Sequence, residues 1–154
     1  MKESVAMVRH ATVVDIGGRG VLLRGPSGCG KSDLALRLMD RGATLVADDQ
    51  AVLEKDTRGV LATAPVALRG FIEVRGLGII SAPVTGSSFI ALVVDLVAEN
   101  AVERLPEKLT AELLGKEIPR ILLNAFEVST PIKIELAVED ASRIGNVGPN
   151  EQNQ

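Results

Sequence analysis

Eight consecutive residues follow the pattern G-x-x-x-x-G-K-S, the phosphate-binding loop known as Walker A. They are Gly25, Pro26, Ser27, Gly28, Cys29, Gly30, Lys31 and Ser32. The glycines let backbone N–H groups approach phosphate oxygens, and the Lys31 ammonium can reach the β and γ phosphates. The Ser32 hydroxyl suits the magnesium ion that accompanies a nucleotide. The pattern therefore predicts a nucleotide site, with a glycine-rich turn that binds nothing as the alternative.

The sequence on either side of this loop favours the nucleotide site. Apolar residues 21–23 predict a strand before it, and residues 31–41 predict a helix that stops at Gly42. A strand, this loop and a helix are the context that a Walker A match requires. Cys29 is the only cysteine, and we interpret it as a small residue at a variable position rather than as a redox switch.

Two adjacent carboxylates and one histidine are candidates for catalysis. The apolar strand predicted over residues 43–47 ends at Asp48 and Asp49. A carboxylate there could hold a metal ion or take a proton from a nucleophile. His10 lies on a strand predicted over residues 5–16, and a hairpin would bring it alongside the loop. The alternatives are acids that merely end a strand in solvent and a histidine on a strand surface.

Three further charged residues, taken alone, have simple structural interpretations. Glu73 and Arg75 lead into a G-x-G sequence, which fits a salt-bridged bulge before a turn. Arg104 lies in a polar, proline-interrupted segment over residues 99–114, where a solvated charge is the simplest interpretation. From the residues alone, none of the three is assigned a role.

The rest of the pattern predicts one domain over residues 1–144 that is rich in strands. Strands are expected within residues 50–64 and over 88–96, 118–125 and 131–138. Short helical segments are expected over 111–114 and 139–144. The Gly-, Pro-, Asn- and Gln-rich tail over 145–154 has nothing to bury, so we expect disorder there.

Composition excludes several classes of protein. The 154 residues are 46% apolar and 24% charged with a net charge of −3, and they include three Phe but no Trp or Tyr. Aromatic residues that could stack on bases are scarce and the chain has no excess of basic residues, so we expect no nucleic-acid partner. No apolar segment is long enough to span a membrane, and a single cysteine suits a reducing compartment. We therefore expect a cytoplasmic protein that does not bind membranes.

Several segments together resemble the catalytic C-terminal domain of the HPr kinase/phosphorylase family. The resemblance rests on His10, the Walker A loop, residues 45–49 with the sequence L-V-A-D-D, and residues 72–80 with the sequence I-E-V-R-G-L-G-I-I. The last segment is similar to the family's own signature and is more specific than a Walker A loop. Long family members carry an N-terminal domain of comparable size, so this sequence resembles the short form found in alphaproteobacteria.

The resemblance implies an α/β fold close to that of phosphoenolpyruvate carboxykinase, with a strongly bent mixed β-sheet and the P-loop helix packed on it. It implies an ATP- and Mg²⁺-dependent kinase that phosphorylates a serine of HPr, the phosphocarrier of the sugar phosphotransferase system. Phosphorolysis would remove that phosphate as pyrophosphate. A homo-oligomer is also implied, since the long enzymes are hexamers.

The resemblance also implies roles for particular residues. Lys31 and the loop amides would hold the phosphates, and Ser32 and Glu73 would be magnesium ligands. Asp49, with Asp48 beside it, would be the base that accepts the serine proton. His10 matches an active-site histidine, and Arg104 matches an arginine that stabilises charge on the transferring phosphoryl group.

One departure from the family pattern leaves the phosphorylase activity open. The family has a basic loop ending in G-R-N that is linked to dephosphorylation, whereas residues 122–130 read L-L-N-A-F-E-V-S-T here. Two alternatives to a kinase acting on HPr are a P-loop kinase of small molecules and a regulatory module that binds ATP without hydrolysing it.

Overall fold

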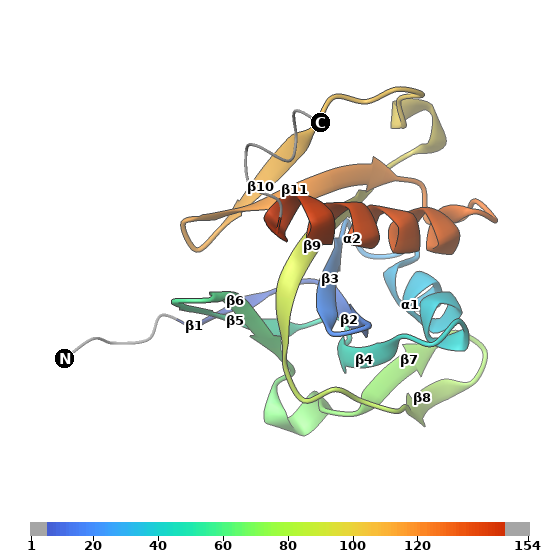
Figure 1. Cartoon of the computed structure of the whole chain (residues 1–154). Coiled ribbons are helices and arrows are strands. Elements are labelled where there is room, and N and C mark those ends of the chain that lie inside the picture. The colour runs from blue at the N-terminus through green and yellow to red at the C-terminus, as the bar shows by residue number, and fades with distance from the viewer. Residues whose placement is uncertain (1–5, 147–154) are drawn as a thin grey trace.

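The computed structural model describes residues 6–146, which fold into a curled mixed sheet with two helices packed on one face (Figure 1). The helices are α1 (Lys31–Asp40) and α2 (Thr130–Asn146). The strands are β1 (Ala6–Arg9), β2 (Thr12–Ile16), β3 (Arg19–Arg24), β4 (Thr44–Ala47), β5 (Ala51–Asp56), β6 (Gly59–Thr63), β7 (Phe71–Val74), β8 (Gly78–Ser81), β9 (Ser88–Leu96), β10 (Leu109–Leu113) and β11 (Lys116–Leu123). Two short 3₁₀ turns are η1 (Val66–Leu68) and η2 (Glu99–Ala101).

The long strand β9 organises the sheet. On one side it pairs in parallel with β3, which continues through β2 to β4. On its other side it pairs first with β6 and then, nearer its C-terminal end, in parallel with β11. Strands β5 and β1 extend the sheet beyond β6, and β10 flanks β11. The mixed, bent sheet expected from the resemblance is therefore confirmed, and β7 and β8 form a separate hairpin below it (Figure 1).

Alternating side chains of the central strands fill a separate core on each face of the sheet. Val21 and Leu23 of β3 pack toward α1 and α2 with Leu34 and Leu38. Leu22, between them, packs on the opposite face. These three successive side chains of β3 thus alternate between the two faces of the sheet, and all three are apolar because both faces are covered. The arrangement anchors the C-terminal end of β3, where the phosphate-binding loop begins.

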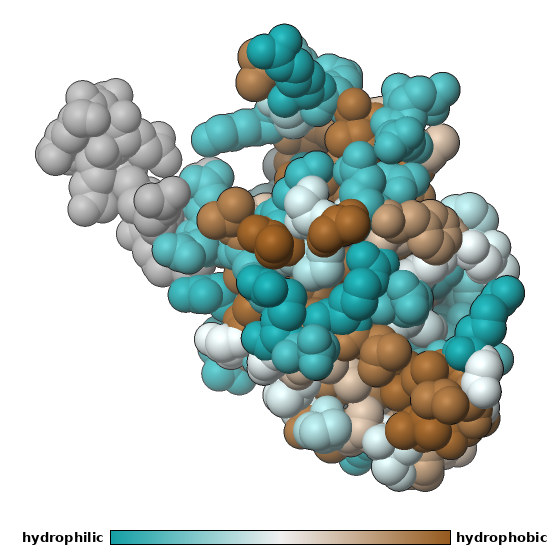
Figure 2. Space-filling model, turned by 90° about the vertical axis from the view of Figure 1, so that its right-hand side faces the viewer, coloured by the Kyte–Doolittle hydropathy of each residue, from teal (hydrophilic) through white to brown (hydrophobic). Residues whose placement is uncertain are grey.

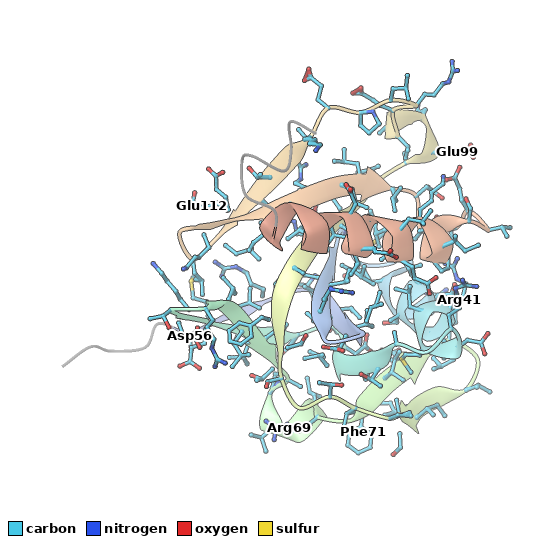
Figure 3. All side chains as sticks on the ribbon, viewed as in Figure 1. Arg41, Asp56, Arg69, Phe71, Glu99 and Glu112 are labelled. Atoms are coloured by element: carbon cyan, nitrogen blue, oxygen red, sulfur yellow. The ribbon has the colours of Figure 1, made fainter. Side chains whose placement is uncertain are left out.

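The two helices are joined by an ion pair as well as by the core. Arg41, directly after α1, donates hydrogen bonds from Nε and Nη2 to the Glu135 carboxylate of α2, both at 2.9 Å (Figure 3).

Neither helix of the described chain is long and apolar enough to cross a membrane.

Two predicted elements were wrong. Residues 131–138 alternate in hydropathy and were expected to form a strand, but they belong to α2. Pro131 suits the first turn of a helix, and Ile134, Val138 and Ala141 recur at helical spacing and are buried. Residues 111–114 were expected to be helical, but Ala111 and Leu113 belong to β10 and point into the core.

The other boundaries agree closely with expectation. The strand predicted over 88–96 is β9, and the helix predicted over 31–41 is α1, one residue shorter. The strand predicted over 5–16 is divided into β1 and β2, with His10 between them. Helix α2 extends to Asn146, and the remainder of the predicted tail lies outside the described residues.

Candidate active site

The Walker A residues form the turn between β3 and α1, and glycine is needed there for two reasons. Gly28 and Gly30 have φ values of 82° and 99°, in the left-handed region that favours glycine. A Cβ atom on Gly30 would also lie 2.9 Å from the Cβ of Ala125 and 3.1 Å from the ring of Phe126. The loop closes through a hydrogen bond from Cys29 N to Pro26 O at 3.1 Å.

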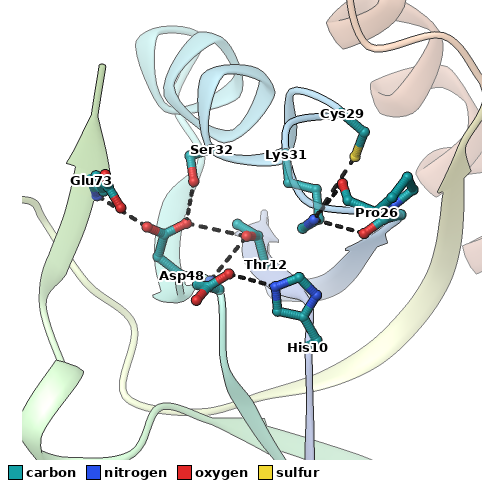
Figure 4. Close-up of polar contacts among 10 residues, drawn as sticks. His10, Thr12, Pro26, Cys29, Lys31, Ser32, Asp48 and Glu73 are labelled. Carbon is teal, nitrogen blue, oxygen red and sulfur yellow. Dashed lines mark hydrogen bonds and ion pairs between the residues drawn. The ribbon is translucent and has the colours of Figure 1, made fainter. Parts of the chain in front are cut away.

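The Lys31 side chain is buried under this loop. Its Nζ donates to the carbonyl oxygens of Gly25 at 2.7 Å and Pro26 at 3.2 Å, and it lies 3.8 Å from Cys29 Sγ (Figure 4). An ammonium group has three donors, so it can exchange these carbonyls for phosphate oxygens. These hydrogen bonds hold the Lys31 ammonium beside the N-terminus of α1 and the loop amides, which also attract anions.

Asp48 is the buried acid of the site, with only 8% of its surface exposed. Its Oδ1 accepts hydrogen bonds from Ser32 Oγ at 2.6 Å and Thr12 Oγ1 at 3.1 Å, and its Oδ2 accepts from the backbone N of Glu73 at 3.0 Å (Figure 4). Three donors compensate the burial of this carboxylate. Asp48 therefore links β2, α1 and β7 around the phosphate-binding loop.

Asp49 points elsewhere and is exposed. Its Oδ1 lies 2.7 Å from Nε2 of His10. Its φ of 71° is left-handed, a conformation that is uncommon for a residue other than glycine. Hydrogen bonds from Asp49 N to Thr12 Oγ1 at 3.2 Å and from Ala11 N to Asp49 O at 3.1 Å hold this backbone. A strained backbone held by its surroundings is typical of functional sites.

These groups surround one cleft of about 710 Å³. Its walls come from the phosphate-binding loop, the exposed side of α1, the ends of β4 and β7, and the segment after β11. The lining residues are Ser27, Gly28, Gly30, Lys31, Ser32, Asp33, Leu36, Asp48, Asp49, Glu73, Val74, Arg75 and Phe126. The volume is in the range that small-molecule sites occupy.

The oxygen atoms at one end of the cleft fit a magnesium ion. The Ser32 hydroxyl and the carboxylates of Asp48 and Glu73 are the hard oxygen donors that Mg²⁺ prefers. Within residues 6–146, no group of three or more His, Cys, Asp or Glu side chains could hold a metal ion by itself.

A second, partly buried acid, Asp95, stabilises the base of the loop. It accepts hydrogen bonds from Arg24 Nε at 2.5 Å and from Arg120 Nε. Burial by itself would raise the pKa of Asp95, but the hydrogen bonds and charges of Arg24 and Arg120 outweigh it and hold the pKa of this carboxyl below its ordinary value. Because Arg24 directly precedes Gly25, the cluster ties β3, β9 and β11 together beneath the loop.

The structure brings together the predicted site residues with one exception. His10 reaches the cleft through Asp49, and Glu73 and Arg75 line it, without the salt bridge to each other that the sequence suggested. Arg104 is exposed in the connection between η2 and β10 and is not among the lining residues.

Two contributors were missed from the sequence. Thr12, a buried polar residue, positions both aspartates, and its hydroxyl within an apolar strand was the available signal. Phe126 lines the cleft from the segment that departs from the family pattern.

Comparisons with known proteins agree with this architecture. Residues 2–143 match the family described as the HPr serine kinase C-terminal domain. The chain is 37% identical over 146 residues to HPr kinase/phosphorylase of Bordetella pertussis, covering 87% of this chain and 46% of that protein. It is 38% identical over 142 residues to HPr kinase/phosphorylase of Lactobacillus acidophilus, covering 84% and 42%. The chain thus spans less than half the length of these relatives.

A solved structure is similar over almost its whole length. The Hpr(Ser) kinase/phosphatase from Coxiella burnetii superposes with a TM-score of 0.81 at 28% sequence identity, covering 96% of each chain. The expected catalytic-domain fold is therefore confirmed.

Proposed function

Because the chain belongs to the family of the HPr serine kinase C-terminal domain, we propose that it transfers the γ-phosphoryl group of ATP to a serine of HPr. The observation that carries this proposal is the pair of His10 and Asp49, 2.7 Å apart at the edge of a cleft floored by a Walker A loop. A phosphate site alone would serve any nucleotide-binding protein. An exposed carboxylate held by a histidine adds a base for an incoming hydroxyl.

In the forward reaction, the serine Oγ attacks the γ-phosphorus while Asp49 accepts the hydroxyl proton, and ADP leaves. The Nε2–H of His10 orients the Asp49 carboxylate toward the incoming hydroxyl. The exposed position of Asp49 is what a protein substrate requires, because its serine must approach from solvent. Asp48, buried and occupied by three donors, is poorly placed to receive that proton.

The phosphate-binding groups supply positioning and charge. The loop amides and Lys31 bind the β and γ phosphates, and the N-terminus of α1 adds its positive end. Ser32, Asp48 and Glu73 would hold Mg²⁺, which neutralises charge on the phosphates when it is bound. Arg75, whose side chain carries a guanidinium group, also lines the cleft. The role of Arg104 in stabilising the transferring phosphoryl group stays a prediction.

The reverse reaction would be phosphorolysis. Inorganic phosphate would attack the phosphorus of phosphoserine, the serine oxygen would take a proton from Asp49, and pyrophosphate would leave. The names of the relatives, HPr kinase/phosphorylase, support this second activity. The G-R-N sequence linked to it is replaced here by residues 122–130.

The first experiment uses the purified protein with HPr, Mg²⁺ and ATP, and mass spectrometry locates the phosphate on HPr. Excess inorganic phosphate is then added and pyrophosphate is measured. Serine phosphate that disappears as pyrophosphate forms would establish both activities, and serine phosphate that persists would establish a kinase alone. If HPr stays unmodified, the proposal is wrong, and a small-molecule kinase or a nucleotide sensor becomes the better interpretation.

We further propose a cytoplasmic homo-oligomer, a hexamer by resemblance to the long enzymes. The hairpin of β7 and β8 supports self-association, because its exposed side chains Phe71, Leu77, Ile79 and Ile80 are apolar. Figure 2 shows hydrophobic side chains gathered at the lower end of one face, at the height of β7 and β8 in Figure 1.

A further inference from the structure

Phe126 is an exposed aromatic residue that the proposed chemistry does not use. It lines the cleft, yet 65% of its surface is exposed. The chain has two other Phe residues and no Trp or Tyr. Phe71 lies on β7 and points away from the body of the molecule (Figure 3), and Phe89 packs under Arg58, whose Cζ lies 4.7 Å from the ring centroid. Phe126 is thus the single aromatic residue among those that line the cleft in the described chain.

The backbone on both sides of Phe126 is held firmly. Its own N donates to Asn124 Oδ1 at 2.9 Å, and Asn124 Nδ2 donates to Val97 O at 3.0 Å. The Arg37 guanidinium of α1 donates to the carbonyl oxygens of Ala125 and Glu127. The exposure of the ring is therefore a property of a fixed segment, not of a loose one. A ring held in this way loses little conformational entropy when a ligand stacks on it.

Strand order places Phe126 and the two acids at opposite ends of the cleft. At the edge where the phosphate-binding loop lies, the strands run in the order β11, β9, β3, β2, β4. Asp48 and Asp49 follow β4, and Phe126 follows β11. The loop follows β3, midway between them. The ring of Phe126 borders the loop at Gly30, and Asp48 borders it at Ser32.

The chemistry of the proposed reaction then fixes the direction of the nucleotide. The γ phosphate must face Asp49, because the serine hydroxyl meets its base there. The α and β phosphates lie over the loop, so the nucleoside must extend toward the other end. We propose that the purine base of the nucleotide stacks on the ring of Phe126. This inference rests on the proposed function, and it names the residue that binds the base.

The surroundings of the ring also predict how bases are distinguished. Among the described residues beside Phe126, Asn124 is occupied by two backbone partners and Glu127 is paired with Lys133 at 3.3 Å. Arg37 is occupied by Asp33 and by the two carbonyl oxygens. Stacking without hydrogen bonds to the base edge discriminates weakly. GTP should therefore bind within about tenfold of ATP.

The test is a calorimetric titration of Phe126→Ala with Mg·ATP and with Mg·tripolyphosphate, which has the phosphates but no base. Removal of one stacking residue should weaken Mg·ATP binding by about tenfold or more and leave tripolyphosphate binding unchanged. Val128→Ala is the matched control: Val128 lies in the same segment with 92% of its surface exposed and outside the cleft. It should change neither affinity.

A second variant keeps the test independent of any loss of folding. In Phe126→Trp the new indole is the only tryptophan of the chain and can still stack. Its fluorescence should change on addition of Mg·ATP or Mg·GTP and stay constant with Mg·tripolyphosphate, and its affinity for Mg·ATP should equal or exceed that of the wild type.

Several results would overturn the inference. The inference is wrong if Phe126→Ala binds Mg·ATP with wild-type affinity. It is also wrong if the variant loses affinity equally for Mg·ATP and Mg·tripolyphosphate, because the ring would then support the phosphate-binding loop instead of the base. Binding of GTP more than about 100-fold weaker than ATP would contradict weak discrimination. The proposed function fails separately: in that case HPr would stay unmodified while Mg·ATP still binds to the wild type.

Discussion

The two adjacent aspartates have different environments, and this separates their roles. Asp48 is buried and accepts from a hydroxyl of α1, a hydroxyl of β2 and an amide of β7. Asp49 is exposed, with a left-handed backbone and a histidine partner. The left-handed backbone of Asp49 leaves its side chain in solvent, whereas the Asp48 side chain faces the Ser32 hydroxyl and the Glu73 amide. The left-handed φ costs about 1 kcal/mol or more, which the bond that Asp49 N donates to Thr12 and the bond that its carbonyl accepts from Ala11 offset.

Asp49→Asn should abolish phosphoryl transfer while leaving nucleotide binding nearly intact. An amide cannot accept the serine proton, so the rate should fall by about 10²- to 10⁴-fold. The measurements are phosphorylation of HPr under single-turnover conditions and calorimetric binding of Mg·ATP. Asp40→Asn, an exposed aspartate at the end of α1 outside the cleft, is the control and should retain full activity. Full activity of Asp49→Asn would show that Asp49 is not the base.

At the scale of elements, Asp95 joins three strands under the phosphate-binding loop. Its partners come from β3 and β11, and all three side chains are partly buried. Because β3 also carries the loop, the geometry of the loop depends on this cluster as well as on the core between the sheet and α1.

Asp95→Asn should lower the free energy of unfolding by about 1–3 kcal/mol at pH 7, because it leaves two guanidinium groups without their charged acceptor. The pKa of Asp95 is lowered in the folded state, so its contribution is complete above the ordinary Asp pKa of about 3.9 and is lost as pH falls toward the folded value. The difference between variant and wild type should therefore shrink below about pH 4.

Urea unfolding followed by far-UV circular dichroism measures this difference, since the chain has no Trp. Glu112→Gln is the control, because Glu112 is an exposed carboxylate on β10 (Figure 3). This variant should change the free energy of unfolding little at any pH. An equal loss of stability at pH 7 and at pH 3 would indicate that packing, and not charge, explains the effect of Asp95→Asn.

At the scale of the whole molecule, the β7–β8 hairpin is divided between the site and the surface. Ile72 is buried in the core under α1, and Glu73 and Arg75 line the cleft. Ile79 pairs with Glu73 across the hairpin, so the face that carries Glu73 also exposes this apolar side chain, and Leu77 is exposed at the turn. A hairpin that both lines the active site and packs against a second copy would make activity depend on assembly.

If the proposed oligomer forms through this hairpin, the double variant Leu77→Asp, Ile79→Asp should reduce it to smaller species, because burying two carboxylates in an apolar contact is strongly unfavourable. Light scattering coupled to size exclusion measures the mass. Val66→Asp, an exposed apolar residue of η1, is the control. An unchanged mass together with a raised KM for HPr would assign the hairpin to substrate docking instead of self-association.

The sequence by itself determined the local features of this protein. The Walker A loop, α1, β9 and the adjacent acids follow from short patterns, because glycine placement, helical periodicity and apolar runs act over neighbouring residues. Residues 72–80 carried the family resemblance. Local pattern failed for α2, where Ile132, Ile134, Leu136 and Val138 alternate like a strand but only Ile134 and Val138 are buried. Which of these side chains is buried depends on the sheet and on α1.

Tertiary structure decided what lies far apart in the chain. The separation of Asp48 from Asp49 depends on Thr12, Ser32 and Glu73, which come from three elements. The place of Phe126 opposite the acids depends on β9 pairing with β3 on one side and β11 on the other. No spacing along the sequence encodes such pairings, since they are set by which apolar faces can be buried together and in which register.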